Sequence, residues 1–383
     1  MIYLDYAATT PVHAEAIEAM RPFLADAFGN PSGLHAVARR AKTALEAARE
    51  TVAEAFGARP DHVVFTAGGT EADNLALKGA GRARRAAGLG DGIVTTAFEH
   101  KGVLAPCERL AREGFRIARV GIGADGIVDL DALASALDDR TVLVSTMLVN
   151  NEVGTVQPLP EIAALVRARA PRAVLHSDAV QSVPWLDGST VRDADLISIS
   201  AHKFGGPKGV GALIVRGVEL VPEVEGGGQE RGLRSGTANV AGIVGMAVAL
   251  RVTAERRVAE VQRVGALRDR LARGLFEVPG AFVNGDPARK VAGNLHLGFR
   301  GVEAETLLVA LDQQGICAAS GSSCSSGATE PSHVLRAMGI DDDDARSSIR
   351  LSLGFGSTAA DVDAALAVVP PTVERLRGRV PSG

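Results

Sequence analysis

The chain has 383 residues, of which 46% are hydrophobic and 22% charged, and its formal net charge is −4 at pH 7. This length is enough for roughly two to three domains with a large buried core. The weak negative charge excludes the strongly basic surfaces that bind nucleic acid or anionic membranes. No apolar run approaches the ~18 residues of a membrane-spanning helix. We therefore expect no nucleic acid and no membrane as partner.

The three cysteines, Cys107, Cys317 and Cys324, form no CxxC pair and are odd in number. This disfavours both a disulfide framework and a zinc site. The first residues, Met1–Asp5, have the pattern of a strand and lack the basic start and apolar core of a secretory signal. We expect a cytoplasmic protein with at least one thiol available for chemistry.

Short apolar strands alternate with amphipathic helical stretches through the first two thirds of the chain. The predicted strands are 63–66, 93–96, 117–120, 141–149, 173–177, 196–200 and 212–215. The predicted helices between them are 70–87, 101–112, 130–137 and 159–168. This alternation predicts an α/β fold with a mostly parallel sheet covered on both faces. Ligands of such sheets bind at the carboxyl ends of the strands.

A long helical pattern from Asn239 to about Leu275 ends this alternation, and the rest of the chain is mixed. The elements expected there are strands at 292–299 and 348–353 and helices at 303–313, 332–337 and from 358. We expect a large domain at 16–255, a smaller α+β domain at 256–383, and an N-terminal segment at 1–15 packed with the small domain. The acidic run Asp341–Asp344 indicates a solvated helix start rather than a metal site, and no metal is expected.

The segment Thr66–Glu71 lies between a predicted strand and a predicted helix and contains the pair Gly68-Gly69 followed by Thr70. Free backbone N–H groups at a helix start bind anions. The spacing is neither GxGxxG nor a Walker loop, so dinucleotides and nucleoside triphosphates fit poorly. A plain capped turn is the alternative for this segment taken alone.

His100 also follows a predicted strand, in Phe98-Glu99-His100-Lys101. It could stack over a heteroaromatic ring and exchange protons, although a single histidine is more often a structural polar residue. Asp178 follows a third strand, with Gln181 about one helical turn later. A carboxylate there can pair with a protonated ring nitrogen and make the ring an electron sink; a helix N-cap is the alternative.

Lys203 stands where the strand 196–200 runs out into a glycine loop. A lysine is costly to desolvate, and partial burial lowers the pKa of its amine. The neutral amine is then suited to act as a Schiff-base nucleophile. Lys101 and Lys208 are rival lysines in naturally solvated positions, and Lys203 is preferred. An anion cradle, a carboxylate and a lysine at three strand ends together predict pyridoxal 5'-phosphate as the cofactor.

Two further loops and one strand carry candidate residues. The loop 226–237 combines glycines with two arginines and suits anion contact, including contact across a subunit interface; a solvated surface loop is the alternative. The loop 318–327 surrounds Cys324 with small polar residues that cannot bury its thiol, although an incidental loop cysteine is the alternative. Arg350 lies in an otherwise β-like stretch, where it could clamp a carboxylate or form a surface ion pair.

With these residues in view, the chain resembles the cysteine desulfurases of the NifS/IscS type, which are pyridoxal-phosphate enzymes of fold type I in the class V aminotransferase group. The resemblance covers essentially the whole chain. It is carried by the segments 3–11, 29–32, 149–154 and 330–336, and by the lysine, Arg-Ser-Gly-Thr and cysteine segments in the family's order.

The resemblance implies a role for each candidate residue. Lys203 would bind the cofactor as a Schiff base, Asp178 would pair with its pyridine nitrogen, and His100 would stack on its ring. The residues that would contact the ring hydroxyl or hold the phosphate are Gln181, Asn151, Gly69, Thr70, Ser200 and His202, with Thr237 supplied by the other subunit of a homodimer. Arg350 would bind the substrate's α-carboxylate, together with Asn151, and Cys324 would accept sulfur as a persulfide.

The implied reaction converts L-cysteine to L-alanine and passes the persulfide sulfur to an acceptor such as an iron–sulfur scaffold or a thiolation protein. Cys324 could also ligate iron transiently on such a scaffold, whereas three scattered cysteines do not favour a cluster within one chain. The alternatives are another class V enzyme (selenocysteine lyase, aminotransferase or a different C–S lyase) and a non-catalytic sulfur carrier. The acceptor's identity is left open by the sequence.

Overall fold

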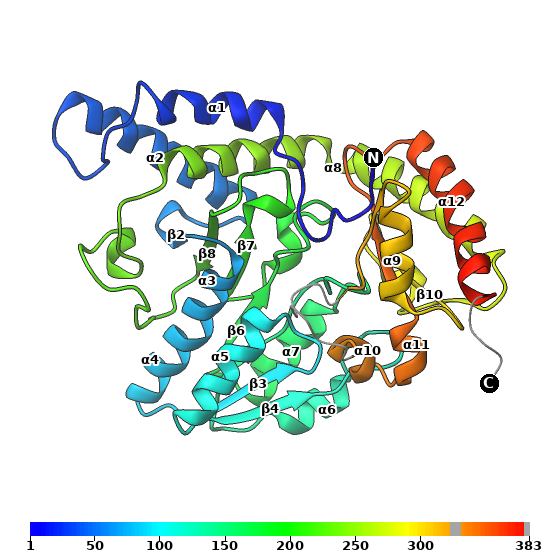
Figure 1. Ribbon diagram of the computed structural model, residues 1–383. Coiled ribbons are helices and arrows are strands. Elements are labelled where there is room, and N and C mark those ends of the chain that lie inside the picture. Colours follow the sequence, from blue (N-terminus) through cyan, green and yellow to red (C-terminus); the bar gives the residue numbers. More distant parts are fainter. Residues whose placement is uncertain (322–330, 379–383) are drawn as a thin grey trace.

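The computed structural model describes residues 1–321 and 331–378. Its centre is a seven-stranded sheet with helices on both faces (Figure 1). The strands are, in the order of the sheet, β2 (Val63–Thr66), β8 (Gly211–Val215), β7 (Leu196–Ser200), β6 (Val174–Asp178), β5 (Thr141–Ser145), β3 (Gly92–Thr96) and β4 (Arg116–Val120). The predicted α/β class is confirmed.

The sheet is mostly parallel, as predicted. β7, β6, β5, β3 and β4 pair in parallel, while β8 is antiparallel to both of its neighbours. Except for the edge strand β4, every residue of these strands is buried. This burial on both faces explains why the strands appear in the sequence as continuous apolar runs rather than alternating ones.

Two apolar cores lie on the two faces of the sheet. Val63 and Phe65 belong to one core, and Val64 between them belongs to the other, because successive side chains of a strand point to opposite faces. The helices of this part are α1 (Ala14–Leu24), α2 (Ala36–Ala55), α3 (Gly69–Asn74), α4 (Ala80–Ala86), α5 (Lys101–Arg112), α6 (Leu130–Ala136) and α7 (Leu159–Arg169). α2, α6 and α7 contribute to the first core, and α3, α4 and α5 contribute to the second.

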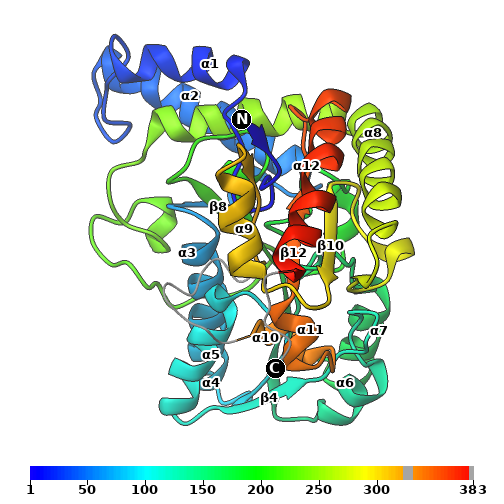
Figure 2. The ribbon, with the colours of Figure 1, turned by 45° about the vertical axis from the view of Figure 1, so that its right-hand side comes forward.

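The helix α8 (Val240–Phe276) connects this sheet to a second, smaller assembly (Figures 1 and 2). The first half of α8 packs in the core of the large sheet, and its second half packs in a separate core. The remaining elements are β9 (Ala281–Val283), β10 (Asn294–Phe299), α9 (Ala304–Asp312), β11 (Ile316–Cys317), α10 (His333–Ala337), α11 (Asp342–Arg346), β12 (Ser348–Ser352) and α12 (Ala359–Arg377).

The smaller assembly is built on an antiparallel sheet in the order β12-β10-β9. The N-terminal strand β1 (Ile2–Tyr3) pairs with β11, and Asp5 bridges to Ser352 at the end of β12. The first residues of the chain therefore lie beside its last third. The exact domain bounds, including the boundary near residue 255, stay a prediction.

Two predicted elements differ from the structure by more than one or two residues at their ends. The strand expected over 141–149 ends at Ser145, because Met147 and Leu148 are buried but donate their N–H groups to Glu99 and Asp178 instead of to a neighbouring ladder. The helix expected over 70–87 is interrupted by a π-helical turn at Leu75–Gly79. The apolar pattern of the sequence reports burial, so it made the predicted strand too long. It also gave no sign of the π-helical turn within the predicted helix.

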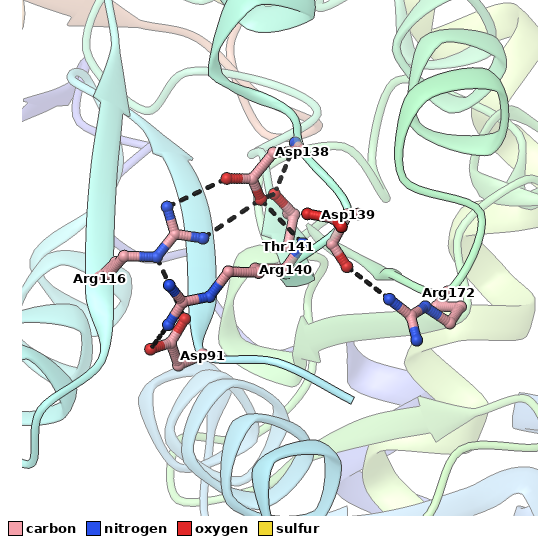
Figure 3. Close-up of polar contacts among 7 residues, drawn as sticks. All are labelled: Asp91, Arg116, Asp138, Asp139, Arg140, Thr141 and Arg172. Atoms are coloured by element: carbon pink, nitrogen blue, oxygen red, sulfur yellow. Dashed lines mark hydrogen bonds and ion pairs between the residues drawn. The ribbon is translucent and has the colours of Figure 1, made fainter. Parts of the chain in front are cut away.

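The edge of the sheet where β3, β4 and β5 begin is held by exposed ion pairs (Figure 3). Arg116 contacts Asp91 at 3.1 Å and Asp138 at 3.0 Å, and Arg140 contacts Asp91 at 2.5 Å. Solvent screens such pairs, so each contributes little to stability. The buried polar groups that invite a chemical role lie at the opposite edge, where the parallel strands end. Within the described ranges, no helix is both long and apolar enough to cross a bilayer.

Candidate active site

A cleft lies at the carboxyl ends of β6 and β7, between these strands, the start of α3 and the N-terminal segment of the chain. Its predicted lining residues are Gly69, Thr70, His100, Asn151, Asp178, Gln181, Ser200, His202, Lys203 and Arg350. It is also lined by residues to which the sequence assigned no role, namely Ala7, Ala8, Asp73, Met147 and Val180. The parallel strand direction brings these distant segments together at one edge.

Lys203 ends the short 3₁₀ turn Ala201–Lys203 that follows β7. Its Nζ donates hydrogen bonds to the carbonyl oxygens of Ala7 at 2.7 Å and Ala8 at 2.9 Å. The rival lysines Lys101 and Lys208 are exposed, and neither lines the cleft. The geometry therefore favours Lys203 as the reacting amine.

Asp178 is the last residue of β6 and is only 5% exposed. Its Oδ1 accepts a hydrogen bond from the backbone N–H of Val180 at 2.9 Å. Burial raises the pKa of Asp178, while His100, this N–H group and Lys203 partly oppose the increase. A cationic ring nitrogen in the cleft would supply the charge partner that a buried carboxylate requires.

His100 caps α5: its Nδ1 accepts from the backbone N–H of Gly102 at 3.0 Å. In the neutral imidazole this hydrogen bond leaves the proton on Nε2. His100 therefore has a structural role at the helix start in addition to its place in the cleft. The sequence left open whether His100 is a structural residue or a functional one, and its position allows both roles.

The proposed phosphate side of the cleft is formed by Gly69 and Thr70 at the start of α3, together with Ser200 at the end of β7. A Cβ atom on Gly69 would lie 2.7 Å from Cγ2 of Val180, so this close approach requires glycine. His202 lies beside them, with its Nδ1 3.1 Å from Oγ1 of Thr9. Burial and the nearby lysines lower the pKa of His202 to about 4, so it is neutral at pH 7.

Arg350 lies in the middle of β12 and is 2% exposed, so it does not form the surface ion pair that the sequence left open. Its Nη1 donates to the carbonyl of Asn151 and its Nη2 to Oδ1 of Asp5, each at 2.7 Å. Nε of Arg350 has no hydrogen-bond partner in the part of the chain that the structure describes. Gln181 donates from Nε2 to the carbonyl of Ala7 at 2.8 Å.

Of the predicted site residues that the structure describes, Thr237 is the one that is not brought into this cleft: it is exposed and does not line it. Cys324 lies outside the described residues. The arginines of the loop 226–237 are already used within the chain, because Arg231 donates to the carbonyl of Val63 and Arg234 pairs with Glu71 at 2.8 Å.

The other cysteines and the acidic run have structural surroundings. Cys107 is buried on α5, and burial raises the pKa of its thiol to about 12. Cys317 is half-buried in β11. Asp341 caps α11, as the predicted helix start requires. Residues 1–321 and 331–378 contain no cluster of three metal-ligating side chains.

Asp73 is the main cleft residue that sequence reasoning missed. It lies three residues after Thr70, so it shares that face of the helix, and it is 1% exposed. Burial and the neighbouring Asp178 raise the pKa of Asp73 well above its usual range. Its Oδ1 lies 3.6 Å from Nε2 of His176. The helical spacing from Thr70 was the signal that could have identified it.

Comparison with known proteins connects this geometry to a family. The family model described as aminotransferase class-V matches residues 2–365. An IscS-like cysteine desulfurase from Mycobacterium tuberculosis is 48% identical over 387 residues, which cover 98% of this chain and 97% of that protein.

Solved structures agree with the sequence relatives. A NifS-like protein superimposes with a TM-score of 0.92 at 36% identity, over 98% of this chain and 100% of that one. The structure titled SspA in complex with cysteine matches with a TM-score of 0.81 at 34% identity, over 92% of this chain and 99% of that one. The similarity therefore spans the large sheet, the smaller assembly and the cleft.

Proposed function

Because the chain belongs to the aminotransferase class V family and, within it, to the cysteine desulfurases, we propose that Lys203 and Cys324 are the two reacting side chains with which it converts L-cysteine to L-alanine. The observation that carries the proposed site is that one cleft contains Lys203, Asp178, His100 and Arg350. The cysteine in the SspA complex supports L-cysteine as the substrate.

Enzymes of this family depend on pyridoxal 5'-phosphate, and the side chains of the cleft fit that group. Asp178 offers a buried carboxylate for the pyridine nitrogen, and Lys203 offers an amine for the aldehyde. Gly69 keeps the start of α3 close to Val180, which leaves the backbone and the hydroxyls of Thr70 and Ser200 for the phosphate. When bound, the cofactor supplies an electron sink for carbanion chemistry.

The remaining steps, substrate binding and proton transfer, are assigned to side chains of the cleft. Arg350 binds the α-carboxylate of cysteine through its guanidinium. Nζ of Lys203 takes the proton from the substrate's Cα and later returns a proton to the carbon skeleton. His100, whose Nδ1 is engaged by Gly102, presents the opposite side of its ring to the reactants.

In the sulfur step, the Cys324 thiolate attacks the sulfur of the substrate. The new S–S bond forms as the substrate's C–S bond breaks, and the electron pair of that bond stays with carbon, where a proton then adds. L-Cysteine and the enzyme thiol thus become L-alanine and an enzyme persulfide, without an external oxidant. We further propose that a sulfur-acceptor protein, such as an iron–sulfur scaffold, takes this sulfur; a cytoplasmic location stays a prediction.

The reaction is tested by incubating the enzyme with L-cysteine and a reductant while measuring alanine and sulfide. Lys203→Ala should abolish both products, whereas Lys101→Ala should retain them. Cys324→Ser should abolish both, whereas Cys317→Ser is the matched thiol control. Full alanine formation by Cys324→Ser would contradict the persulfide step and favour another class V reaction, such as a different C–S lyase.

We also propose a homodimer in which Thr237 completes the phosphate site of the partner subunit. Thr237 is exposed, and the neighbouring Arg234 contacts Glu71 next to the cleft. Leu24, Phe28 and Leu34, between 71% and 90% exposed, form an apolar stretch around the α1–α2 connection that a second subunit could cover.

Subunit complementation tests this arrangement. Lys203→Ala and Thr237→Glu are both expected to be inactive as homodimers, the second because a carboxylate repels the phosphate. A mixed dimer would contain one site with wild-type Lys203 and Thr237, so mixing after denaturation and refolding should restore activity. Mixed dimers as inactive as the parents would contradict the shared site.

A further inference from the structure

One buried carboxyl, that of Glu152, meets the chain on both sides of the segment 322–330. On the C-terminal side, Oγ of Ser332 donates a hydrogen bond to Oε2 of Glu152. On the N-terminal side, a Cβ atom on Gly321 would lie 3.1 Å from the same Oε2. The two ends of the segment that carries Cys324 therefore converge on Glu152, which is 2% exposed.

His296 on β10 approaches the same point. Its side chain is fully buried, and its Nε2 also lies 3.1 Å from the Cβ position of Gly321. Its Nδ1 lies 2.9 Å from Nδ2 of Asn284, which can donate to it, so the neutral ring carries its proton on Nε2. This buried N–H group has no hydrogen-bond partner in the described ranges. Gly321 has φ +87°, a left-handed backbone conformation that favours glycine.

Glu152 is also joined to the cleft. The preceding residue, Asn151, lines the cleft and accepts a hydrogen bond from Arg350 at 2.7 Å. The carbonyl of Glu152 accepts from Nδ2 of Asn294 at 2.9 Å. Arg350 in turn exchanges two backbone hydrogen bonds with Ala319, at 2.6 and 3.2 Å, just before Gly321. A continuous set of contacts thus connects Arg350, which we propose binds the substrate, to both ends of the segment 322–330.

We propose that Glu152 is a positioning residue for sulfur transfer, which holds the two ends of the segment 322–330 in a fixed relation to Arg350 and the cleft. The proposal rests on the proposed persulfide chemistry of Cys324. A misplacement of about 1 Å can cost roughly 100-fold in rate. A buried carboxyl that accepts a hydrogen bond, as Glu152 does from Ser332, resists displacement because leaving it unpaired is costly.

The test compares Glu152→Ala, Ser332→Ala and Ser332→Thr with wild type, and uses Glu161→Ala as the exposed control. In the full-length holoenzyme, removing the carboxyl or the hydroxyl should lower kcat for alanine formation roughly 10- to 100-fold. KM for cysteine and cofactor affinity should stay within about twofold. Ser332→Thr retains a hydroxyl and should retain most of the rate.

Hydrogen–deuterium exchange provides a readout independent of turnover. Amides of residues 333–336 should exchange at least about tenfold faster in Glu152→Ala, in which Ser332 can still cap α10, while those of α5 should be unchanged. Exchange like wild type, or a loss of cofactor affinity that matches the loss of kcat, would overturn the proposal. If wild type formed no alanine, or if Cys324→Ser formed it at full rate, the proposed function would fail instead. The exchange rates would still decide whether Glu152 holds the C-terminal end of the segment.

Discussion

Asp5 and Arg350 are 345 positions apart in the sequence, yet Oδ1 of Asp5 lies 2.7 Å from Nη2 of Arg350. Arg350 is almost fully buried, whereas Asp5 keeps 20% of its side chain exposed. A buried guanidinium requires a compensating charge. Asp5 supplies it in the protein alone, and the α-carboxylate of the substrate would meet the same cation.

This shared cation predicts opposite effects for two substitutions. Arg350→Lys should lower kcat/KM for cysteine roughly 10- to 100-fold, because a hydrogen bond to a charged group contributes about 1.5–3 kcal/mol. Asp5→Asn should lower KM, because the incoming carboxylate no longer faces a like charge, and should also lower the melting temperature of the free enzyme. Steady-state kinetics and thermal denaturation measure both effects, with exposed Asp26→Asn as the control. A raised KM in Asp5→Asn would contradict the competition.

Two replacements of His100 distinguish its role as the cap of α5 from its proposed role in proton transfer. His100→Asn retains a short polar acceptor for the N–H of Gly102 at the start of α5, whereas His100→Ala removes it. Both variants should lose roughly 100- to 10,000-fold in kcat if the imidazole assists proton transfer. His100→Ala should also lose about 1 kcal/mol of stability from the missing cap. Equal stability of the two variants in urea denaturation would mean that the cap contributes nothing.

Glu99 predicts a pH dependence of stability. It is fully buried, and its Oε1 accepts from Oγ1 of Thr96 at 2.6 Å and from the N–H of Met147 at 2.8 Å. Burial raises the pKa of Glu99 from 4.5 to about 8. The folded protein therefore holds a proton that the unfolded chain releases, and the stabilisation present below pH 4.5 is lost as the pH rises to about 8.

Glu99→Gln removes this titration while retaining an acceptor for Thr96 and Met147. The variant should melt progressively above wild type as the pH rises from 4.5 to 8, where the wild type must bury a charge. Thermal denaturation at several pH values measures the difference, and Glu161→Gln on the exposed face of α7 is the control. A constant difference across this range would show that Glu99 does not titrate there.

The parts of the site that could be predicted from the sequence depend on local signals. The strands β2 and β7 and the helix α5 have the predicted bounds, because apolar runs end at polar or glycine residues there and His100 caps α5. Strand direction then placed Asp178 and Lys203 at one edge of the sheet. These are properties of short windows and of general sheet topology.

The remaining features depend on contacts between distant segments. Nothing near Asp5 indicates that it pairs with Arg350, and nothing near Glu152 indicates that Ser332 and Gly321 meet it. Asp5 meets Arg350 because the N-terminal segment lies beside β12, and Glu152 meets Ser332 because the residues before α10 pack against the turn after β5. A buried polar residue can be recognised only when the surroundings that satisfy it are known.

Gly69 offers a prediction in which a second substitution should reverse the first. In Gly69→Ala the new Cβ would lie 2.7 Å from Cγ2 of Val180 and 3.4 Å from Cβ of Ser200. Relieving the first contact must move the start of α3 or the segment after β6, and overpacking of this kind costs about 1–3 kcal/mol. Because both segments line the phosphate side of the cleft, cofactor affinity should fall roughly 5- to 100-fold.

Val180→Ala in the Gly69→Ala background removes the methyl group that the new Cβ meets. The double variant should therefore recover most of the cofactor affinity, measured by titrating cofactor-depleted protein. Gly265→Ala in α8 is the matched control, because its new Cβ would approach only Ala292, at 3.8 Å. A helical glycine replaced by alanine without a clash should leave affinity unchanged and stabilise the fold by about 0.5–1 kcal/mol. If Val180→Ala did not restore cofactor binding, the contact with Val180 would not be the cause of the loss in Gly69→Ala.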